Sequence, residues 1–248
     1  MIAGNISAFV LHRKPYRETG HWVSLFTYEF GRVAAIYRPS RKKSGPLLSP
    51  FQAFVIELHG EGELKTLRQL DDVQSPILLS GTAQYAGFYL NELLYRLLPL
   101  YEPHEHLFQA YADLLSRLQV PGALEARLRE FEGLLLSELG LGLELWPEGA
   151  ETHTFASYAF DVQEGRVIFF GEHPQPSRAP GVIEGLDPAL LKAAARHDWS
   201  VAGALAVAKV LHRARIDYVL EGKPLKSRNL LKQYLELGRV EKKSTPGR

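Results

Sequence analysis

The first part of the chain alternates apolar and polar residues, which is the pattern of β-strands that bury one face. Segments rich in glycine, proline and charged residues separate the alternating stretches and predict turns. The alternating stretches read SAFVLHR, HWVSLFTYEF, GRVAAIYR, QAFVIELHG and ELKTLRQLDDV. Short strands in this number, with a long loop after the third, predict a small barrel. The five-stranded OB-fold barrel is the natural candidate, and an SH3-like barrel has the same strand count.

After Pro76 the spacing of apolar residues changes to three and four, which predicts amphipathic helices. Three helical segments come first, then an aromatic, turn-rich stretch between Thr152 and Pro180 that predicts one or two hairpins and a Pro-rich loop. Three more helical segments and a basic tail follow. The helical segments are LSGTAQYAGFYLNELLYRLLP, HEHLFQAYADLLSRLQ, ALEARLREFEGLLLSELGLG, DPALLKAAARHD, VAGALAVAKVLHRARIDYVLEG and KPLKSRNLLKQYLEL.

We therefore predict an α+β fold, in which an N-terminal five-stranded OB-fold barrel precedes a mainly α-helical region with a small β-hairpin insertion. The expected domains are the barrel (1–78), a central helical bundle (79–150), the hairpin and loop region (151–182) and C-terminal helices that pack on the bundle (183–248).

Composition narrows the class of protein. The chain has 248 residues, of which 46% are hydrophobic, so it can bury a real core. It contains no cysteine, which excludes disulfides and thiolate zinc sites. We find no leader-like start and no apolar run long enough to cross a bilayer. We therefore expect no membrane partner and a cytoplasmic protein.

Charge is distributed unevenly along the chain. The net charge is only +1, but residues 1–50 hold eight Lys/Arg against two Asp/Glu, and residues 205–248 hold eleven against four. Residues 51–204 hold ten against twenty-two. Basic ends around an acidic middle favour a polyanionic partner for the ends. The alternative is that these segments pair with one another or are solvated.

Motifs of catalysis are missing from the sequence. We find no P-loop, no dinucleotide-binding glycine pattern, no nucleophile elbow and no HExxH. His104 and His106 bracket Glu105, but residues two apart on a helix point in nearly opposite directions, which argues against a zinc site. We therefore predict a protein that is not an enzyme and that needs no metal or other cofactor.

The sequence instead offers cations interleaved with aromatic residues on the predicted barrel. Cations attract phosphates through counterion release, and aromatic rings can stack unpaired bases. The most distinctive signal is the basic loop YRPSRKKSGPLLSPFQ, which contains no carboxylate. For each aromatic residue the alternative is core packing, and for the loop it is a solvated turn. The candidate DNA-binding residues here are Arg13, Lys14, Tyr16, Arg32, Tyr37, Arg38, Arg41, Lys42 and Lys43.

A second cationic cluster lies near the end of the chain, in GKPLKSRNLLKQYLEL. Lys223, Lys226 and Arg228 fall in the first turns of a predicted helix, where the backbone amides already carry partial positive charge. Cations at this place cost stability, so the helix start could be built to meet an anion. The alternative is that Pro224 simply starts the helix and the lysines are solvated.

Several segments together resemble the RecO family of bacterial recombination mediators, in its form without zinc-binding cysteines. They are FVLHRKPYRETGHWVSLFTYEFGRV, GELKTLRQLDDV, YLNELLYRLLP, LREFEGLLLSELGLGLEL and GKPLKSRNLLKQY, in the same order and spacing as in the family. The resemblance implies an OB-fold barrel and a helical region. It also implies binding of single- and double-stranded DNA, annealing of complementary strands, and partners: the tail of the single-stranded DNA-binding protein SSB, RecR, often RecF, and indirectly RecA.

Some members of that family hold zinc in the region that corresponds to Thr152–Pro180. This chain lacks the cysteines, so we expect the hairpin to be held by apolar packing of Phe155, Tyr158, Phe160, Ile168 and Phe169.

The resemblance also suggests where an SSB tail would bind. This tail is acidic and ends in an apolar residue with a free carboxylate, so its receptor should be an apolar groove edged by cations. Arg129 occupies the corresponding basic position, and Arg127 could assist it. The alternative for these arginines is a salt bridge with Glu125, Glu130 or Glu132. Glu130 makes the expected groove less cationic.

The leading hypothesis is a DNA-binding and annealing mediator that neutralises two strands on separate basic surfaces. A protein-interaction adaptor, whose basic surfaces bind acidic protein tails, is the main alternative. A nuclease on the same barrel would need clustered carboxylates to hold a divalent metal.

Overall fold

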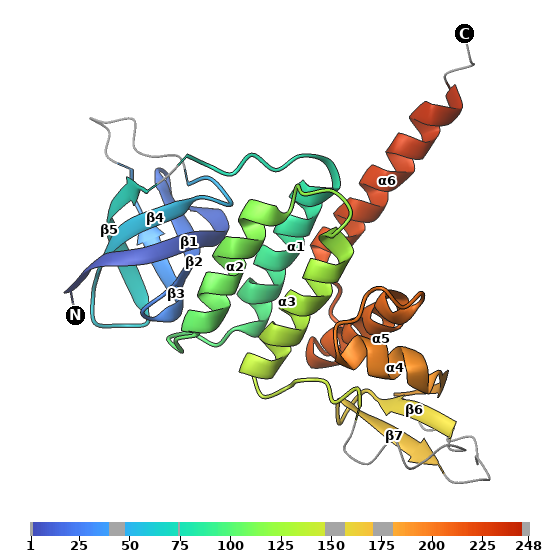
Figure 1. Ribbon diagram of the computed structural model, residues 1–248. Helices are drawn as coiled ribbons and strands as arrows, with labels where there is room; N and C mark the ends of the chain where they lie inside the picture. Colours follow the sequence, from blue (N-terminus) through green and yellow to red (C-terminus); the bar gives the residue numbers. More distant parts are fainter. Residues whose placement is uncertain (1, 40–47, 74, 147–156, 171–180, 245–248) are drawn as a thin grey trace. The chain divides into compact units, whose positions relative to one another are not determined.

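The computed structural model describes residues 2–39, 48–73, 75–146, 157–170 and 181–244 (Figure 1). The chain divides into two compact units. Unit 1 comprises Met1–Val120 and Leu225–Arg248, and unit 2 comprises Pro121–Pro224. This division differs from the four consecutive segments expected from the sequence, because the C-terminal segment belongs to the same unit as the N-terminal barrel.

A closed barrel forms the first part of unit 1. Its strands are β1 (Ile2–Tyr16), β2 (Gly20–Thr27), β3 (Gly31–Tyr37), β4 (Ala53–His59) and β5 (Leu64–Asp72). They follow one another around the barrel in the order β1-β2-β3-β5-β4, and only the β3–β5 pair is parallel. This is the arrangement of the OB-fold, so the predicted five-stranded barrel is confirmed.

The interior of the barrel is filled by the apolar half of each alternating strand. Val23, Leu25 and Phe54 are fully buried, and Ile6 and Ile56 are nearly so. The alternation of apolar and polar residues arises because successive side chains of a strand point to opposite faces. The pattern that predicted the strands is therefore the pattern that closes their core.

Two helices of unit 1, α1 (Gly81–Leu97) and α2 (Glu105–Arg117), cover part of the barrel's outer face (Figure 1). Phe9 of β1 and Phe26 of β2 are cross-strand partners that point outward. The ring of Phe108 lies 5.4 Å from that of Phe9 and 5.3 Å from that of Phe26, between ring centroids. Tyr111 packs edge-on to Phe9 at 5.0 Å. These four rings form a buried aromatic cluster between barrel and helices.

The third helix of unit 1, α6 (Lys226–Ser244), packs against α1. Its first amides are capped by a carboxylate of α1: the backbone N–H groups of Lys226 and Ser227 donate to the two oxygens of Glu92 at 2.9 and 2.8 Å. The Ser227 hydroxyl also donates to Glu92 at 2.6 Å. Further along, Tyr234 packs on Tyr85 with ring centroids 4.8 Å apart. The anion that the helix start meets is therefore an internal one.

Unit 2 combines helices with a small sheet. Its elements are α3 (Leu124–Glu138), β6 (Ser157–Asp161), β7 (Arg166–Phe170), β8 (Val182–Leu186), α4 (Pro188–Ala195) and α5 (Ala204–Val219). The sheet has the order β7-β6-β8 and both pairs are antiparallel. The predicted hairpin is confirmed, and the structure adds β8, which the sequence analysis did not predict.

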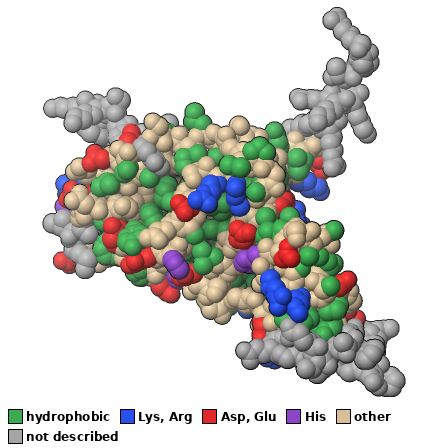
Figure 2. Space-filling model, in the orientation of Figure 1, with side chains coloured by type: hydrophobic (Ala, Val, Ile, Leu, Met, Phe, Trp, Pro, Cys, Tyr) green, Lys and Arg blue, Asp and Glu red, His purple; other side chains and the backbone are tan. Residues whose placement is uncertain are grey.

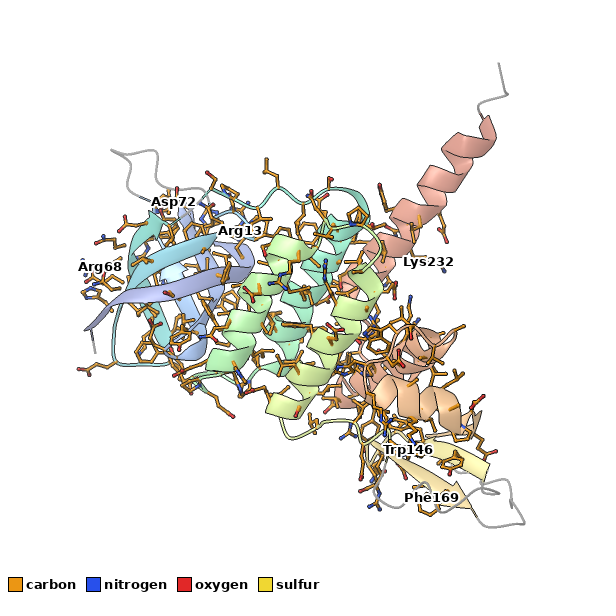
Figure 3. The ribbon with its side chains drawn as sticks, viewed as in Figure 1. Arg13, Arg68, Asp72, Trp146, Phe169 and Lys232 are labelled. Atoms are coloured by element: carbon orange, nitrogen blue, oxygen red, sulfur yellow. The ribbon has the colours of Figure 1, made fainter. Side chains whose placement is uncertain are left out.

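The hairpin is held partly by the apolar packing expected from the sequence. Tyr158 and Phe160 are buried, whereas Ile168 is half-buried and Phe169, near the end of β7, is 36% exposed (Figure 3). Phe155 lies outside the described residues.

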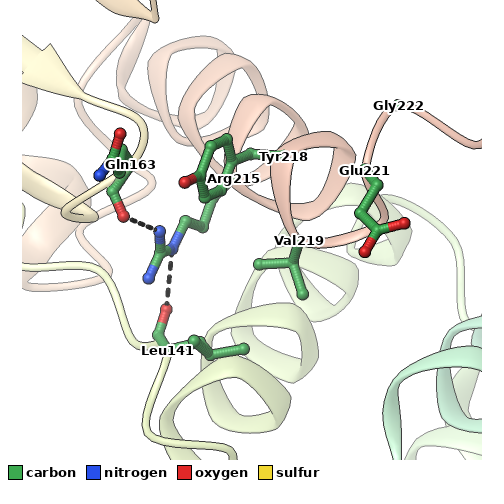
Figure 4. A pocket seen from close by; sticks show the side chains of 7 residues that line it. All are labelled: Leu141, Gln163, Arg215, Tyr218, Val219, Glu221 and Gly222. Carbon is green, nitrogen blue, oxygen red and sulfur yellow. Dashed lines mark hydrogen bonds between the residues drawn. The ribbon is translucent and has the colours of Figure 1, made fainter.

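A buried arginine supplements this packing. Arg215 of α5 donates from Nε to the carbonyl of Leu141 at 3.2 Å, and from one terminal nitrogen to the carbonyl of Val162 at 2.9 Å and to that of Gln163 (Figure 4). The same guanidinium borders a pocket of about 540 Å³. Because these carbonyls belong to the segment after α3 and to the β6–β7 turn, one side chain ties three parts of unit 2 together.

We expect Glu92→Gln to loosen α6. The substitution removes the charge from a carboxylate that accepts three hydrogen bonds at a helix start. The free energy of unfolding should fall by about 1.5–3 kcal/mol, the range for hydrogen bonds to a charged group. Hydrogen exchange of the Lys226 and Ser227 amides should accelerate.

The matched control is Glu236→Gln, which removes an exposed carboxylate of α6 at 4.0 Å from Lys232. Surface pairs of this kind contribute little to stability, so its unfolding should hardly change. Equal effects of the two substitutions would contradict the role of Glu92.

Candidate nucleic-acid interface

A β-bulge in β1 determines which of its side chains face outward. Pairing with β2 places Val10 opposite Leu25 and His12 opposite Ser24, so Leu11 is skipped. Before this bulge the even-numbered residues point into the barrel, and after it they point out, because an extra residue reverses the alternation. The bulge therefore brings His12 and Lys14 to the outer face.

Three rings gather at this part of the outer face: those of His12, Trp22 and Tyr95, which we call the aromatic triad. Trp22 is the cross-strand partner of Lys14, and Tyr95 comes from α1. The ring of Tyr95 lies 4.9 Å from that of His12 and 6.3 Å from that of Trp22, between centroids. His12 is exposed, and Trp22 and Tyr95 are half-buried.

Two cations flank the aromatic triad. The ammonium group of Lys14 lies 4.8 Å from the centre of the Trp22 ring, and the guanidinium of Arg32 lies 5.8 Å from that of Tyr95. Both distances are within the range of cation–π attraction. The site therefore combines positive charge and aromatic surface, as the sequence predicted, but largely through rings that the sequence analysis did not select.

Arg32 also has a structural task. Its Nε donates to the carbonyl of Leu98 at 2.7 Å, just beyond the end of α1, and burial lowers its pKa from the ordinary value. The guanidinium stays positive because an arginine pKa is so high. Arg32 thus joins β3 to α1 and contributes charge to the site from a half-buried position.

The C-terminal helix adds a cation to the same site. The pKa of His12 is lowered first by partial burial of its ring beside Tyr95, then by the charge of Lys14, and then by that of Lys226, whereas Glu92 acts in the opposite direction. The backbone N–H of Lys226 donates to Glu92 at 2.9 Å, and Glu92 lies one helical turn before Tyr95, whose ring packs on His12, so the start of α6 lies near the aromatic triad. We therefore treat Lys14 and Lys226 as parts of one candidate surface.

The other cations of the C-terminal cluster have intramolecular contacts. Lys223 belongs to unit 2, and its ammonium group lies 2.6 Å from Glu221. The Arg228 guanidinium lies 5.5 Å from the centre of the Tyr89 ring. Glu92 already caps the backbone N–H groups of Lys226 and Ser227, so these two groups are not available to an external anion.

The remaining candidates on the barrel lie at varied places. Arg13 and Arg38 are exposed, and Arg13 pairs with Val23, so it faces the opposite way from Lys14 (Figure 3). Tyr16 is half-buried, with the Arg17 guanidinium 5.3 Å from its ring centre. Arg41, Lys42 and Lys43 lie outside the described residues.

Tyr37 requires a correction. Its side chain is 7% exposed and belongs to the barrel core, so its ring is not available for stacking at the surface.

Charges of both signs are mixed on the face shown in Figure 2. There, Lys and Arg side chains form small groups among carboxylates and apolar side chains. On this face, binding would therefore depend on particular residues rather than on a broad positive field. In the described part of the chain, no group of three or more His, Asp or Glu side chains could hold a metal ion. None of the described helices is long and apolar enough to span a membrane.

Comparisons with known proteins agree along most of the chain. Residues 1–76 match the family model for the recombination protein O N terminal region, and residues 78–229 match that for its C terminal region. The chain belongs to the RecO family. The DNA repair protein RecO of Hahella chejuensis is 39% identical over 237 residues, covering 93% of this chain and 96% of that protein. RecO of Stutzerimonas stutzeri is 41% identical over 223 residues, covering 90% and 91%.

The arginines that the RecO resemblance connects with an SSB tail lie on α3. Arg129 is only 5% exposed, and its guanidinium lies 2.7 Å from the carboxylate of Glu132, which is fully buried. The Nδ1 atom of His212 lies 3.3 Å from the other oxygen of Glu132. The salt-bridge alternative is therefore what the structure shows for Arg129. Arg127 is half-buried and also has interactions within the chain.

A pocket of about 700 Å³ lies beside this ion pair in unit 2. Its lining is mainly apolar, but it includes the carboxylates of Glu130 and Glu144, and Glu130 accepts a hydrogen bond from Trp199 at 2.9 Å. Electrostatics at this pocket therefore do not favour an acidic tail.

We expect Arg129→Met to act on stability. It leaves the charge of Glu132 buried without its arginine, and breaking a buried pair in this way costs about 3–5 kcal/mol. Urea denaturation should show this loss, and the double substitution Arg129→Met/Glu132→Gln should recover much of it because the buried charge is gone.

Arg213→Met serves as the control, since Arg213 is exposed and lies 3.6 Å from Asp217. The loss of stability caused by this substitution should be small. If Arg129→Met left the unfolding curve unchanged, the buried ion pair would not stabilise this protein.

Proposed function

We propose that this RecO-family chain is a DNA repair mediator that binds DNA and brings complementary strands together without a catalytic step. The observation that carries the proposal is the convergence of Lys14 and Lys226, from opposite parts of the chain, on the aromatic triad. A polyanion with flat bases is the ligand that such a surface fits best.

Cations supply the affinity in this proposal. Each lysine that neutralises a phosphate releases a condensed counterion, so binding weakens as salt is added. Lys14, Lys226 and partly Arg32 supply the charge, and Arg13 and Arg38 extend the phosphate track along the barrel. The basic loop of Arg41, Lys42 and Lys43 is proposed as a further phosphate clamp.

Annealing follows from charge neutralisation on one surface. Two free strands repel each other through their phosphates, and a strand held against lysines presents less charge to a second strand. The same argument covers binding of double-stranded DNA, whose phosphates remain accessible to the cations. No nucleotide hydrolysis and no cofactor are needed for this step.

Partners of the repair machinery are proposed from the family. They are the SSB tail, RecR, often RecF, and RecA indirectly. For the SSB tail, Arg129 corresponds to the family's basic position and Arg127 lies next to it, but the buried Arg129–Glu132 pair argues for a receptor built from other groups. We place the protein in the cytoplasm, at the nucleoid, because its proposed ligand is there.

The salt dependence of DNA binding tests the proposal. Lys14→Ala and Lys226→Ala should each weaken binding to all sequences, and each should reduce the slope of log K against log salt by about 0.7–0.9. Titration of a labelled single strand at several salt concentrations measures both effects.

Lys209→Ala is the matched control, because Lys209 is an exposed lysine of unit 2 that pairs with Glu125 at 2.9 Å. It should leave the slope unchanged. If Lys14→Ala and Lys226→Ala behaved like Lys209→Ala, while acidic peptides competed for the same surface, the adaptor function would replace the proposed one.

The pH dependence provides a second test. Lys14 and Lys226 hold the pKa of His12 below its ordinary value in the free protein, after the larger effect of burial. A phosphate bound to these lysines favours the charged imidazole, so the pKa of His12 should rise and binding should take up a proton. DNA affinity should therefore increase as pH falls from about 8 to about 5, the range in which histidine titrates.

His12→Gln should flatten this pH dependence, because glutamine keeps a polar side chain but cannot accept the proton. Binding titrations across the pH range, for both proteins at constant ionic strength, measure the difference. Parallel curves for the two proteins would show that His12 does not face the bound phosphate.

A further inference from the structure

The outer face of the barrel carries two groups of aromatic rings with opposite surroundings. Phe9, Phe26, Phe108 and Tyr111 are all at most 8% exposed and join the barrel to the helices. The aromatic triad lies on the same face, past the bulge of β1, and it remains partly open to solvent. Packing alone accounts for the first group but leaves the open rings of the second unexplained.

The triad is assembled from separate elements. β1 supplies His12, β2 supplies Trp22 and α1 supplies Tyr95. The rings lie within 4.9–6.3 Å of one another, between centroids, and the ring planes of His12 and Trp22 are inclined at 62°. A rigid scaffold of strand pairing and helix packing thus holds aromatic surface at a defined place.

Cations at the edge of the triad restrict the ligand further. Lys14 lies against the Trp22 ring, and Glu92, one turn before Tyr95 on α1, holds the start of α6 with Lys226 through a hydrogen bond of 2.9 Å. A ligand that satisfies both features has a flat ring and an adjacent negative charge. Each nucleotide of a DNA strand has this combination.

The base must be unpaired to use the triad. In a duplex, the faces of each base are covered by neighbouring bases, so side-chain rings cannot stack on them without unstacking the helix. In a single strand the faces are accessible, and stacking on an aromatic residue contributes substantially to binding.

We propose that the aromatic triad stacks an unpaired nucleobase, while Lys14 and Lys226 contact the phosphates beside it. This inference rests on the proposed DNA-binding function and adds a preference for single strands at this site. It also provides for release: once the base pairs and stacks within a new duplex, it leaves the triad, and only the phosphate contacts remain.

Trp22 can report on its own environment. The chain has three tryptophans, and the other two, Trp146 and Trp199, belong to unit 2. The full-length variant Trp146→Phe/Trp199→Phe therefore leaves Trp22 as the single indole fluorophore. An oligothymidine strand should quench this fluorescence as it binds. A duplex of the same length, and a strand of abasic sugar-phosphate units, should bind through phosphates without comparable quenching.

Comparison of the three polymers distinguishes failure of the stacking inference from failure of the proposed DNA-binding function. Binding of all polymers with equal quenching, or with none, would overturn the stacking inference and leave DNA binding intact. Absence of binding to every polymer at low salt would overturn the proposed function itself.

Substitution of Trp22 gives a second measurement. Trp22→Leu should lower affinity for the single strand by about fivefold to a hundredfold, as expected for loss of one stacked base, and should change duplex affinity by less than about twofold. Trp22→Phe should restore part of the loss because it retains a ring. An equal loss for single strand and duplex, or equal affinities of the Leu and Phe variants, would overturn the inference.

Two controls accompany these substitutions. Trp146→Phe removes a tryptophan that stacks on Tyr158 in unit 2, and it should leave both affinities unchanged. Lys14→Ala should weaken binding of the single strand and of the duplex by the same factor. If Trp22→Leu fails to fold, as judged by thermal unfolding, the fluorescence experiment still decides, because it keeps Trp22 in place.

Discussion

The reversal of side-chain direction within β1 is the constraint on which the outer surface depends. Ile6, Ala8 and Val10 fill the barrel, and a strand that kept this alternation would point His12 and Lys14 inward as well. A buried lysine in an apolar core would be very costly. The bulge at Leu11 avoids this cost and at the same time places a cation beside the ring of its cross-strand partner.

A second constraint comes from the electrostatics of α6. Cations in the first turn oppose the helix dipole, and the carboxylate of Glu92 compensates by accepting hydrogen bonds from the first two amides and from a hydroxyl. This leaves Lys226 close to the barrel with its side chain exposed. The same contact that stabilises the helix therefore delivers its charge to the proposed binding surface.

The barrel could be predicted from the sequence because its strands alternate clearly and its turns contain strong breaking residues. The strand β8 could not be predicted from the sequence, because its segment VIEGL is short and contains Gly185, which has a positive φ. The pairing of Lys14 with Trp22 was accessible in principle, because the residues lie at equal distance from the turn at Arg17–Thr19. The contributions of Tyr95 and Glu92 could not be predicted from the sequence, because they depend on how α1 packs against distant segments. Burial of Tyr37 and Arg129 likewise depends on tertiary packing, which residue type alone does not report.

Unit 1 is discontinuous in the chain, with the whole of unit 2 inserted between Val120 and Leu225. During translation, the barrel and α1 emerge from the ribosome well before α6 does. A nascent polypeptide that ends inside the insertion lacks Lys226 and leaves Glu92 without the amides that it caps. Only a protein synthesised through α6 assembles the complete surface. Prematurely terminated products therefore carry the barrel but lack the charge of Lys226.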